Sequence, residues 1–220
     1  HDGDPLKKRG LYQHRGGSRC FYDVFMSGPR ALLYWDPMPH VPAVFASQPR
    51  DGLWPDVAAT FHGKWEERNW RNVPGPFYGA MTDNCWVGRL HAPLHVLYGD
   101  DVDYEQEFLY RQPGNLEQLR AVIVAAQEDP WAGWACDGDA HWTPILVRQW
   151  WRERERVREW ITAKHRRWSV SDRIDEREAA TGLADYLVYL DGDLKVHLQA
   201  YSYFLDNHVS PTAGDCLPSL

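Results

Sequence analysis

The sequence predicts an α+β fold, in which a Pro-rich N-terminal half with short antiparallel strands packs on a C-terminal half of three helices. Eleven of the fifteen prolines precede Gly114, and they exclude long helices because a proline inside a helix removes a backbone hydrogen bond. After Gly114 the apolar residues recur at helical spacing. Strands and helices do not alternate, so we do not expect the parallel sheet of a nucleotide-binding fold.

Length and composition favour one domain. The chain has 220 residues, of which 44% are hydrophobic and 25% are charged, and this is enough for a single hydrophobic core. We expect one α+β domain over residues 1–220. Within it we expect a loose arm at 1–17, a β and irregular portion at 18–114, a helical portion at 115–207 and an irregular tail at 208–220.

Charge and hydropathy narrow the class of protein. The net charge of -7 argues against general nucleic-acid binding. The longest apolar run, Ala121–Ala126, is far shorter than the roughly 20 residues of a membrane span. The sequence opens without a signal-peptide pattern, and its many arginines are typical of a GC-rich bacterial genome. We therefore expect a soluble, cytoplasmic protein with no membrane partner.

The four cysteines are far apart in the sequence. They lie at Cys20, Cys85, Cys136 and Cys216, and none forms a C-x-x-C pair. Such spacing fits neither a zinc knuckle nor the disulfide framework of a small secreted domain. We expect four free thiols.

Two hairpins are predicted in the N-terminal half. Aromatic and β-branched runs on either side of Ser27-Gly28-Pro29 predict the first, over 20–35. Strands at 94–98 and 107–110, separated by an acidic turn at 99–101, predict the second.

The segments between the hairpins are predicted to be irregular. Five prolines between 36 and 55 leave room for only a short strand at Val44–Ala46. Residues 61–86 mix aromatic side chains with Gly, Pro and Asn, which is typical of a loop packed by its own side chains.

Three helices are predicted after Gly114. Asn115 with Gln118 resembles a capping box that opens a helix over 116–128. Thr143 and Pro144 open the second helix, over 144–168. The third starts at Ser171 or Asp172, and its apolar spacing of three and four continues through 191–193. We therefore favour one long, kinked helix there over two.

The helix over 144–168 is basic in an otherwise acidic chain. It carries eight Lys and Arg against three Glu. One reading is a solvated face with pairs of Glu153 with Arg156 and of Glu155 with Arg158. The other reading is a surface that attracts a phosphate, a nucleotide or an acidic protein.

The turn before this helix is the main candidate site. Asp137, Asp139 and His141 place two carboxylates and an imidazole just ahead of a helix N-terminus, as acid–base chemistry would use them. We expect these three candidate catalytic residues to line the principal pocket, whereas the alternative is a turn that only caps a helix. The candidate ligand-binding residues are Trp134, Trp142, Tyr78, Asp83 and Trp86.

No metal or cofactor is assigned from the sequence. His91 and His95 have the i, i+4 spacing of a metal-binding pair, and His62 would be a possible third ligand. Pro93 lies between the pair and argues against the helix that this spacing requires.

Glu105-Gln106-Glu107, with Arg19 and Ser47 upstream, is similar to the Arg, Ser, Glu-x-Glu order of mono-ADP-ribosyltransferases. The resemblance implies that Glu107 is catalytic, that Arg19 and Ser47 hold NAD, and that Glu105 orients the acceptor. The helical half of the chain lies outside this resemblance.

Three hypotheses for function follow. The first is an enzyme that binds a small polar ligand, such as a nucleotide or a sugar, in an aromatic, acidic cleft. The second is an interaction module, for instance an immunity-type or regulatory protein whose acidic surface masks a basic target protein. The third is an NAD-using enzyme like the mono-ADP-ribosyltransferases. No G-x-G-x-x-G, P-loop or G-x-S-x-G motif favours another class.

Overall fold

A computed structural model of the chain describes residues 33–48, 55–99 and 104–220. In these residues the chain forms helices and two small antiparallel sheets of two strands each, which confirms the α+β class. The expected arm at 1–17 and most of the expected first hairpin lie outside the described residues.

The Pro-rich segment contains a helix where a short strand was expected. Residues Val41–Ala46 form α1, directly after the 3-10 turn η1 at Met38–His40. The prediction of a strand at Val44–Ala46 is therefore wrong. Pro42 lies in the first turn of α1, where the missing N–H has no helical partner to lose.

The segment that follows is mostly irregular, as expected. It contains α2 at Val57–Thr60, the 3-10 turn η2 at Trp65–Glu67 and α3 at Gly88–His91. The side chain of Asn72 organises its buried middle, because Nδ2 donates to the carbonyl of Gly79 and Oδ1 accepts from the backbone N–H groups of Gly79 and Leu109. A buried amide that is satisfied in this way holds a loop in one conformation.

The two sheets differ in how far apart their strands lie in the sequence. β2 at Val96–Tyr98 pairs with β3 at Glu107–Leu109, which confirms the second hairpin. β1 at Tyr78–Gly79 pairs with β4 at Trp134–Ala135, across the whole of α4. This second pairing brings the turn after β4 against the loop that carries β1.

The predicted helix starts are confirmed at two positions. The side chain of Asn115 accepts from the N–H of Gln118 at 3.0 Å and caps α4, Leu116–Gln127. The hydroxyl of Thr143 accepts from the N–H of Leu146 at 3.3 Å and caps α5, Pro144–Arg152.

Two of the three expected helices are divided. The helix over 144–168 becomes α5 and α6, Arg154–Trp168, because Glu153 between them leaves helical geometry. The third becomes α7, Ile174–Asp191, and α8, Leu194–Asn207. The expectation of one long helix is therefore wrong. The apolar spacing continues through the junction because α7 and α8 both face the core, and it does not show the break at Gly192.

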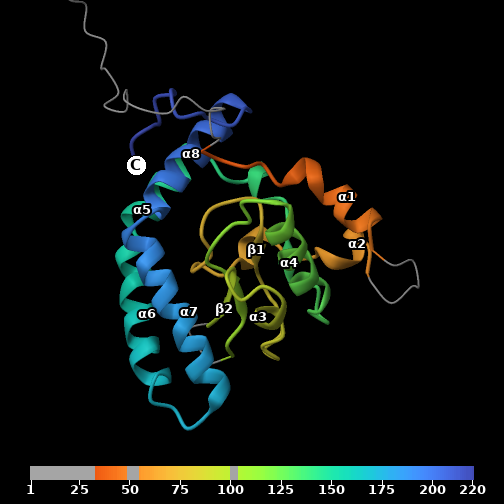
Figure 1. Cartoon of the computed structure of the whole chain (residues 1–220), viewed down its shortest axis with the longest axis vertical. Coiled ribbons are helices and arrows are strands. Elements are labelled where there is room, and N and C mark those ends of the chain that lie inside the picture. The colour runs from red at the N-terminus through yellow and green to blue at the C-terminus, as the bar shows by residue number, and fades with distance from the viewer. Residues whose placement is uncertain (1–32, 49–54, 100–103) are drawn as a thin grey trace, which may run out of the picture.

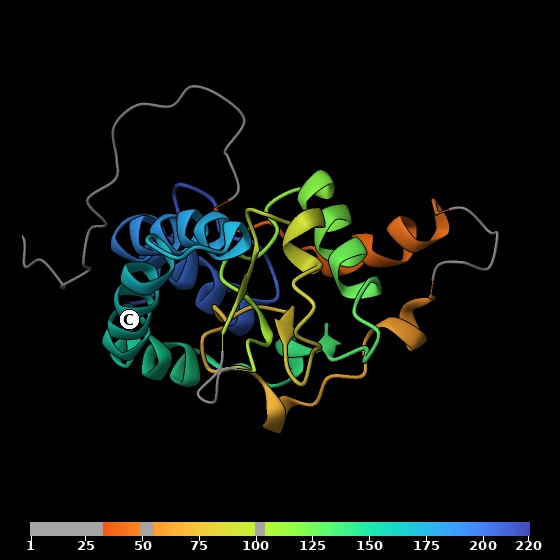
Figure 2. The ribbon, with the colours of Figure 1, turned by 90° about the horizontal axis from the view of Figure 1, so that it is seen from below.

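The helices α5 to α8 lie along one side of the molecule, and the small sheets lie between them and α4 and α1 (Figure 1). Figure 2 shows the same division from below. One hydrophobic cluster joins the two halves, since it contains Phe108 and Trp134 as well as Ile161 and Tyr186. The α+β halves therefore share a core.

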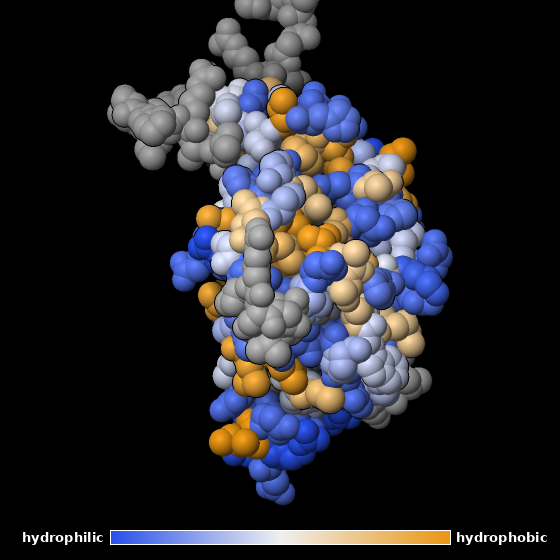
Figure 3. All heavy atoms as spheres, turned by 90° about the vertical axis from the view of Figure 1, so that its right-hand side faces the viewer, coloured by the Kyte–Doolittle hydropathy of each residue, from blue (hydrophilic) through white to orange (hydrophobic). Residues whose placement is uncertain are grey.

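On the face that carries α1 and α2, apolar side chains are scattered among polar ones (Figure 3). Single exposed apolar residues are ordinary on protein surfaces. Across residues 33–48, 55–99 and 104–220, no helix combines the length and the apolar character that crossing a bilayer requires.

The prediction of four free thiols is wrong. Cys216 is disulfide-bonded, whereas Cys85 and Cys136 are free, and Cys20 lies outside the described residues. Sequence spacing gave no sign of this bond, because sequence alone does not determine which cysteines pair.

Candidate functional site

A pocket of about 140 Å³ lies between the loop 68–78 and the helices α5 and α6. We call it the α5–α6 pocket. Aromatic and charged side chains both line it. The aromatic side chains are Trp70, Tyr78, Trp142 and Trp150, and the charged side chains are Arg68, Glu153 and Arg156.

One helical face forms the pocket wall. Leu146, Gln149, Trp150, Glu153 and Val157 line the pocket, and each lies three or four positions from at least one of the others. Residues at this spacing lie on the same side of a helix. The face runs from α5 into α6 in spite of the break at Glu153, so the wall is continuous.

Two guanidinium groups rest on tryptophan rings at this pocket. Cζ of Arg68 lies 3.8 Å from the ring centroid of Trp65 and 5.8 Å from that of Trp142. Cζ of Arg156 lies 3.8 Å from the ring centroid of Trp70. Burial lowers the pKa of Arg68. Among the described residues, no carboxylate lies within ion-pair distance of either group.

The two asparagines of the pocket wall serve the fold. Nδ2 of Asn69 donates to the carbonyl of Gly99 at 2.6 Å, and Oδ1 of Asn69 accepts from the backbone N–H of Arg71 at 3.1 Å. Asn72 is satisfied by backbone groups in the same way. The polar groups left for a ligand therefore come from the arginines and from the helical wall.

Asp137 and His141 form a hydrogen-bonded pair beside the pocket. The hydroxyl of Tyr78 donates to Oδ1 of Asp137 at 2.7 Å, and Nε2 of His141 lies 3.1 Å from Oδ2 of Asp137. The imidazole stacks on Trp65 with ring centroids 4.8 Å apart. Burial and the bond to Asp137 both raise the pKa of Tyr78, which keeps its hydroxyl a donor. The pair adjoins the pocket through Tyr78 and does not line it.

Asp139 points elsewhere. Its Oδ1 accepts from the hydroxyl of Tyr201 on α8 at 2.6 Å. Burial raises its pKa to about 6. Residues 138–140 form the 3-10 turn η3, with Asp137 and His141 at its two ends and Asp139 inside it. The turn therefore separates the three candidate catalytic residues, and Asp139 stands apart.

Of the candidate ligand-binding residues, Tyr78 and Trp142 line the pocket, whereas Trp134, Asp83 and Trp86 do not. Trp134 is fully buried in the core. Asp83 is buried, and its backbone N–H donates to Oδ1 of Asp129 at 3.1 Å. Trp86 stacks on Tyr98 with ring centroids 4.6 Å apart. Trp134 and Trp86 pack in the hydrophobic core.

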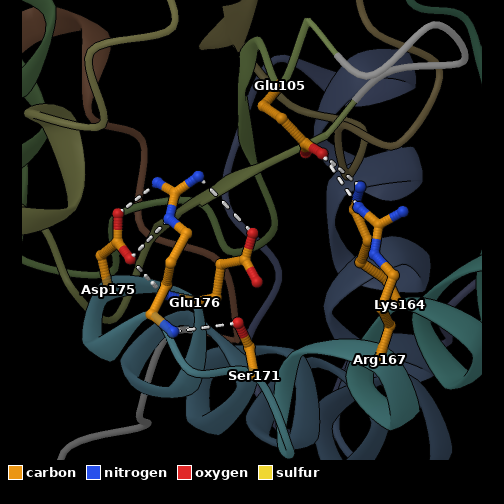
Figure 4. A network of polar contacts seen from close by, with 7 residues as sticks. Glu105, Lys164, Arg167, Ser171, Asp175 and Glu176 are labelled. Atoms are coloured by element: carbon orange, nitrogen blue, oxygen red, sulfur yellow. Dashed lines mark hydrogen bonds and ion pairs between the residues drawn. The ribbon is translucent and has the colours of Figure 1, made fainter.

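The Glu-x-Glu pair occupies two different environments. Glu107 is 1% exposed, and its Oε1 accepts from the backbone N–H of Gly88 at 2.7 Å. Glu105 forms ion pairs with Lys164 and Arg167 (Figure 4). Ser47 is the C-cap of α1, where the resemblance would place a strand, and Arg19 lies outside the described residues. This geometry does not add support for an NAD site.

The three histidines considered as metal ligands lie in different environments. His95 is buried, and its Nδ1 lies 2.8 Å from the carbonyl oxygen of Arg111. Burial lowers its pKa. His91 and His62 are exposed. In the part of the chain that the structure describes, no three His, Cys, Asp or Glu side chains are grouped to hold a metal ion.

Comparison of the chain with protein-family models, with curated proteins and with solved structures finds no match.

Sequence reasoning missed both arginines and Trp150 as residues of the pocket. Trp70 and Arg68 lie in the stretch Glu66-Glu67-Arg68-Asn69-Trp70, and Trp150 and Arg156 lie on the basic helix. Alternation of aromatic and basic residues in both segments is the signal that could have linked them. Of the two pairs predicted on this helix, Glu155 with Arg158 forms, whereas Glu153 does not pair with Arg156, which is exposed and lines the pocket.

Proposed function

We propose that the protein binds a small polar organic molecule in the α5–α6 pocket. The observation that carries the proposal is the combination of four aromatic side chains with Arg68 and Arg156 around one hollow. Ligand sites are typically apolar hollows with a few fixed polar groups. The lining carries two cations and one carboxylate. Asp137 of the acidic turn is linked to the pocket by its hydrogen bond with Tyr78, which lines it.

The volume sets the size of the part that is bound. An engineered cavity of about 150 Å³ in another protein holds one benzene molecule. At about 140 Å³ the α5–α6 pocket has room for one ring, and a larger ligand would extend into solvent. We therefore expect a ring-sized group to enter.

Competition by a side chain that fills the pocket tests this proposal. Gln149 is exposed and lines the pocket, so Gln149→Trp should fill it with little effect on the core. Ile145→Trp is the matched control, since Ile145 is on the same helix, is 67% exposed and does not line the pocket.

The readout is ligand-detected NMR with a library of small ring compounds. We expect compounds that bind the wild type and the Ile145→Trp variant, and that lose binding to Gln149→Trp. If wild-type binders bind Gln149→Trp equally well, the pocket is not the site. If no compound binds the wild type, the interaction-module hypothesis becomes the better one.

A second candidate function is proton transfer by the Asp137–His141 pair. A carboxylate that holds one imidazole nitrogen orients the ring for general-base catalysis through the other. Nε2 of His141 is held by Asp137 at 3.1 Å, and its side chain is 34% exposed. Within the described residues Nδ1 of His141 makes no hydrogen bond. This arrangement favours an enzyme that acts on the bound molecule.

Turnover of a compound found in the binding screen tests this candidate. We expect His141→Gln to abolish its conversion, followed by NMR over hours, while the compound still binds. His91→Gln is the control, because His91 is exposed on α3 and away from the pocket lining. Equal conversion by His141→Gln, or no conversion by the wild type, rejects the catalytic role and leaves the binding proposal in place.

A further inference from the structure

We propose that the ligand of the α5–α6 pocket is an organic anion, whose ring enters the pocket and whose carboxylate or phosphate oxygens are bound by Arg68 and Arg156. This inference rests on the proposed function and names the class of ligand.

Stacking fixes how the two guanidinium groups are presented. A guanidinium is planar, and its N–H donors lie in that plane, so stacking on an aromatic face leaves the donors free at the edge. Arg68 rests on Trp65 and Arg156 on Trp70, each with 3.8 Å from Cζ to the ring centroid. One donor of Arg68 is used, since Nη1 donates to the carbonyl of Trp65 at 2.9 Å. The other donors are the groups that bind carboxylates and phosphates best.

No carboxylate of the pocket lining pairs with Arg68 or Arg156, so their remaining N–H donors can bind a ligand. Glu153 is the only carboxylate among the lining residues, and its Oε1 accepts from Nε2 of Gln149 at 3.0 Å. Glu153 lies three positions before Arg156, yet the two do not form an ion pair. Arg158 shows the contrast on the same helix, because its guanidinium is bound by Glu155 and Asp191. The two pocket arginines are therefore the unneutralised cations of the site.

The surroundings strengthen attraction for an anion. Arg68 is partly buried, so its guanidinium has lost part of its hydration, and this lowers its pKa. Charges that are partly removed from water interact more strongly with an opposite charge than exposed ones do. The rings of Trp142 and Trp150 provide apolar contact for the body of the ligand, whereas the ring of Trp70 carries the guanidinium groups of Arg71 and Arg156.

Three nearly isosteric probes separate charge from shape. Benzoate is an anion, benzamide is neutral and benzamidine is a cation, and each carries one ring. We expect benzoate to bind about 10- to 100-fold more tightly than benzamide, as a charge-assisted hydrogen bond would give, and benzamidine to bind most weakly. Phenyl phosphate and inorganic phosphate are two further probes. Phenyl phosphate shows whether the site prefers a phosphate to a carboxylate, and inorganic phosphate shows whether the ring is needed. Isothermal titration at two salt concentrations measures all five.

Charge-removing variants assign the donors. Arg156→Met and Arg68→Met keep much of the side-chain length and should each weaken benzoate binding about 10-fold or more, while benzamide binding changes little. Arg152→Met is the matched control, because Arg152 is exposed one turn before Arg156 and does not line the pocket. Melting temperatures of all three variants show whether each is folded, and Arg156→Met, at an exposed position, is the variant on which the inference depends.

The outcomes distinguish this inference from the proposed function. If benzamide or benzamidine binds as tightly as benzoate and phenyl phosphate, the pocket binds ligands and the anion assignment is wrong. The assignment also fails if Arg156→Met binds benzoate as the wild type does. If none of the ring compounds binds, both the inference and the proposed function are rejected.

Discussion

The indole Nε1 of Trp134 donates a hydrogen bond to Oε2 of Glu107 at 3.1 Å, and both side chains are buried in the core. This bond links β4 to β3 and so ties the two small sheets together. Gly88 donates its backbone N–H to the other oxygen of Glu107. The two bonds hold a carboxyl group where water does not reach it.

The first prediction concerns Glu107 and pH. Burial raises its pKa from 4.5 to about 8, against the opposing effect of the two hydrogen bonds. The folded protein therefore keeps a proton that the unfolded chain releases. The stabilising contribution of this group is full below pH 4.5 and is lost as pH rises to about 8. Between these two pH values the free energy of unfolding should fall by up to about 1.4 kcal/mol per pH unit.

Urea denaturation between pH 5 and pH 9 measures this effect. Glu107→Gln should lose the part of the pH dependence that comes from this group, because an amide does not titrate. The exposed Glu117→Gln on α4 is the control and should behave as the wild type does. Parallel curves for the wild type and Glu107→Gln would show that another group is responsible.

The second prediction concerns Asp139, which binds Tyr201 at 2.6 Å and lies away from the α5–α6 pocket. From the sequence alone, Asp139→Asn would impair ligand binding with little loss of stability. The structure predicts instead that Asp139→Asn changes stability and leaves ligand binding nearly unchanged. The pKa of Asp139 is raised by burial from 3.8 to about 6, so its stabilising contribution is lost as pH rises through 6.

Asp139→Asn should therefore remove part of the pH dependence of stability between pH 4 and pH 6 and leave ligand affinity within about twofold. The exposed Asp172→Asn serves as the control. A large loss of affinity in Asp139→Asn at unchanged stability would contradict this prediction and show that the carboxylate of Asp139 contributes to ligand binding.

The third prediction compares two ion pairs. The side chains of Lys164 and Glu105 are 7% and 14% exposed, whereas those of Arg158 and Asp191 are 29% and 57% exposed. Removing one partner of a buried ion pair costs on the order of 3 kcal/mol, whereas exposed pairs contribute about 0.2 to 1 kcal/mol.

Glu105→Gln should thus lower the free energy of unfolding several-fold more than Asp191→Asn does. Added salt should reduce the smaller effect and leave the larger one nearly unchanged, since exposed pairs are screened. Equal effects in urea denaturation would mean that the Glu105 pair is not buried in solution.

The fourth prediction is a thiol count. Under denaturing, non-reducing conditions a thiol reagent should modify Cys85 and Cys136, and it should modify Cys216 only after reduction. In the native protein Cys136 should react slowly, because burial raises its pKa to about 11 and little thiolate is present. Cys136→Ser should remove the slow phase and keep the fast one. Four thiols before reduction would contradict the disulfide of Cys216.

The sequence by itself determined the features that depend on neighbouring residues. The α+β class, the β2–β3 hairpin and the caps at Asn115 and Thr143 were all read correctly. Each depends on turn chemistry, a capping side chain or apolar spacing within a few positions, and these act before distant parts of the chain meet. The sequence also predicted Tyr78, Asp137 and His141 as residues of one candidate site, and hydrogen bonds join these three side chains.

Tertiary structure decided the rest. The bond between Trp150 and Trp70 joins residues 80 positions apart, and only this packing places Arg156 over Trp70 to form the pocket. Whether Asp139 faces a ligand or Tyr201 depends likewise on where α8 packs. Such contacts depend on the fit of whole surfaces rather than on local pattern, because core side chains must fill space together. The division of the basic helix into a solvated side and a pocket wall follows from that packing.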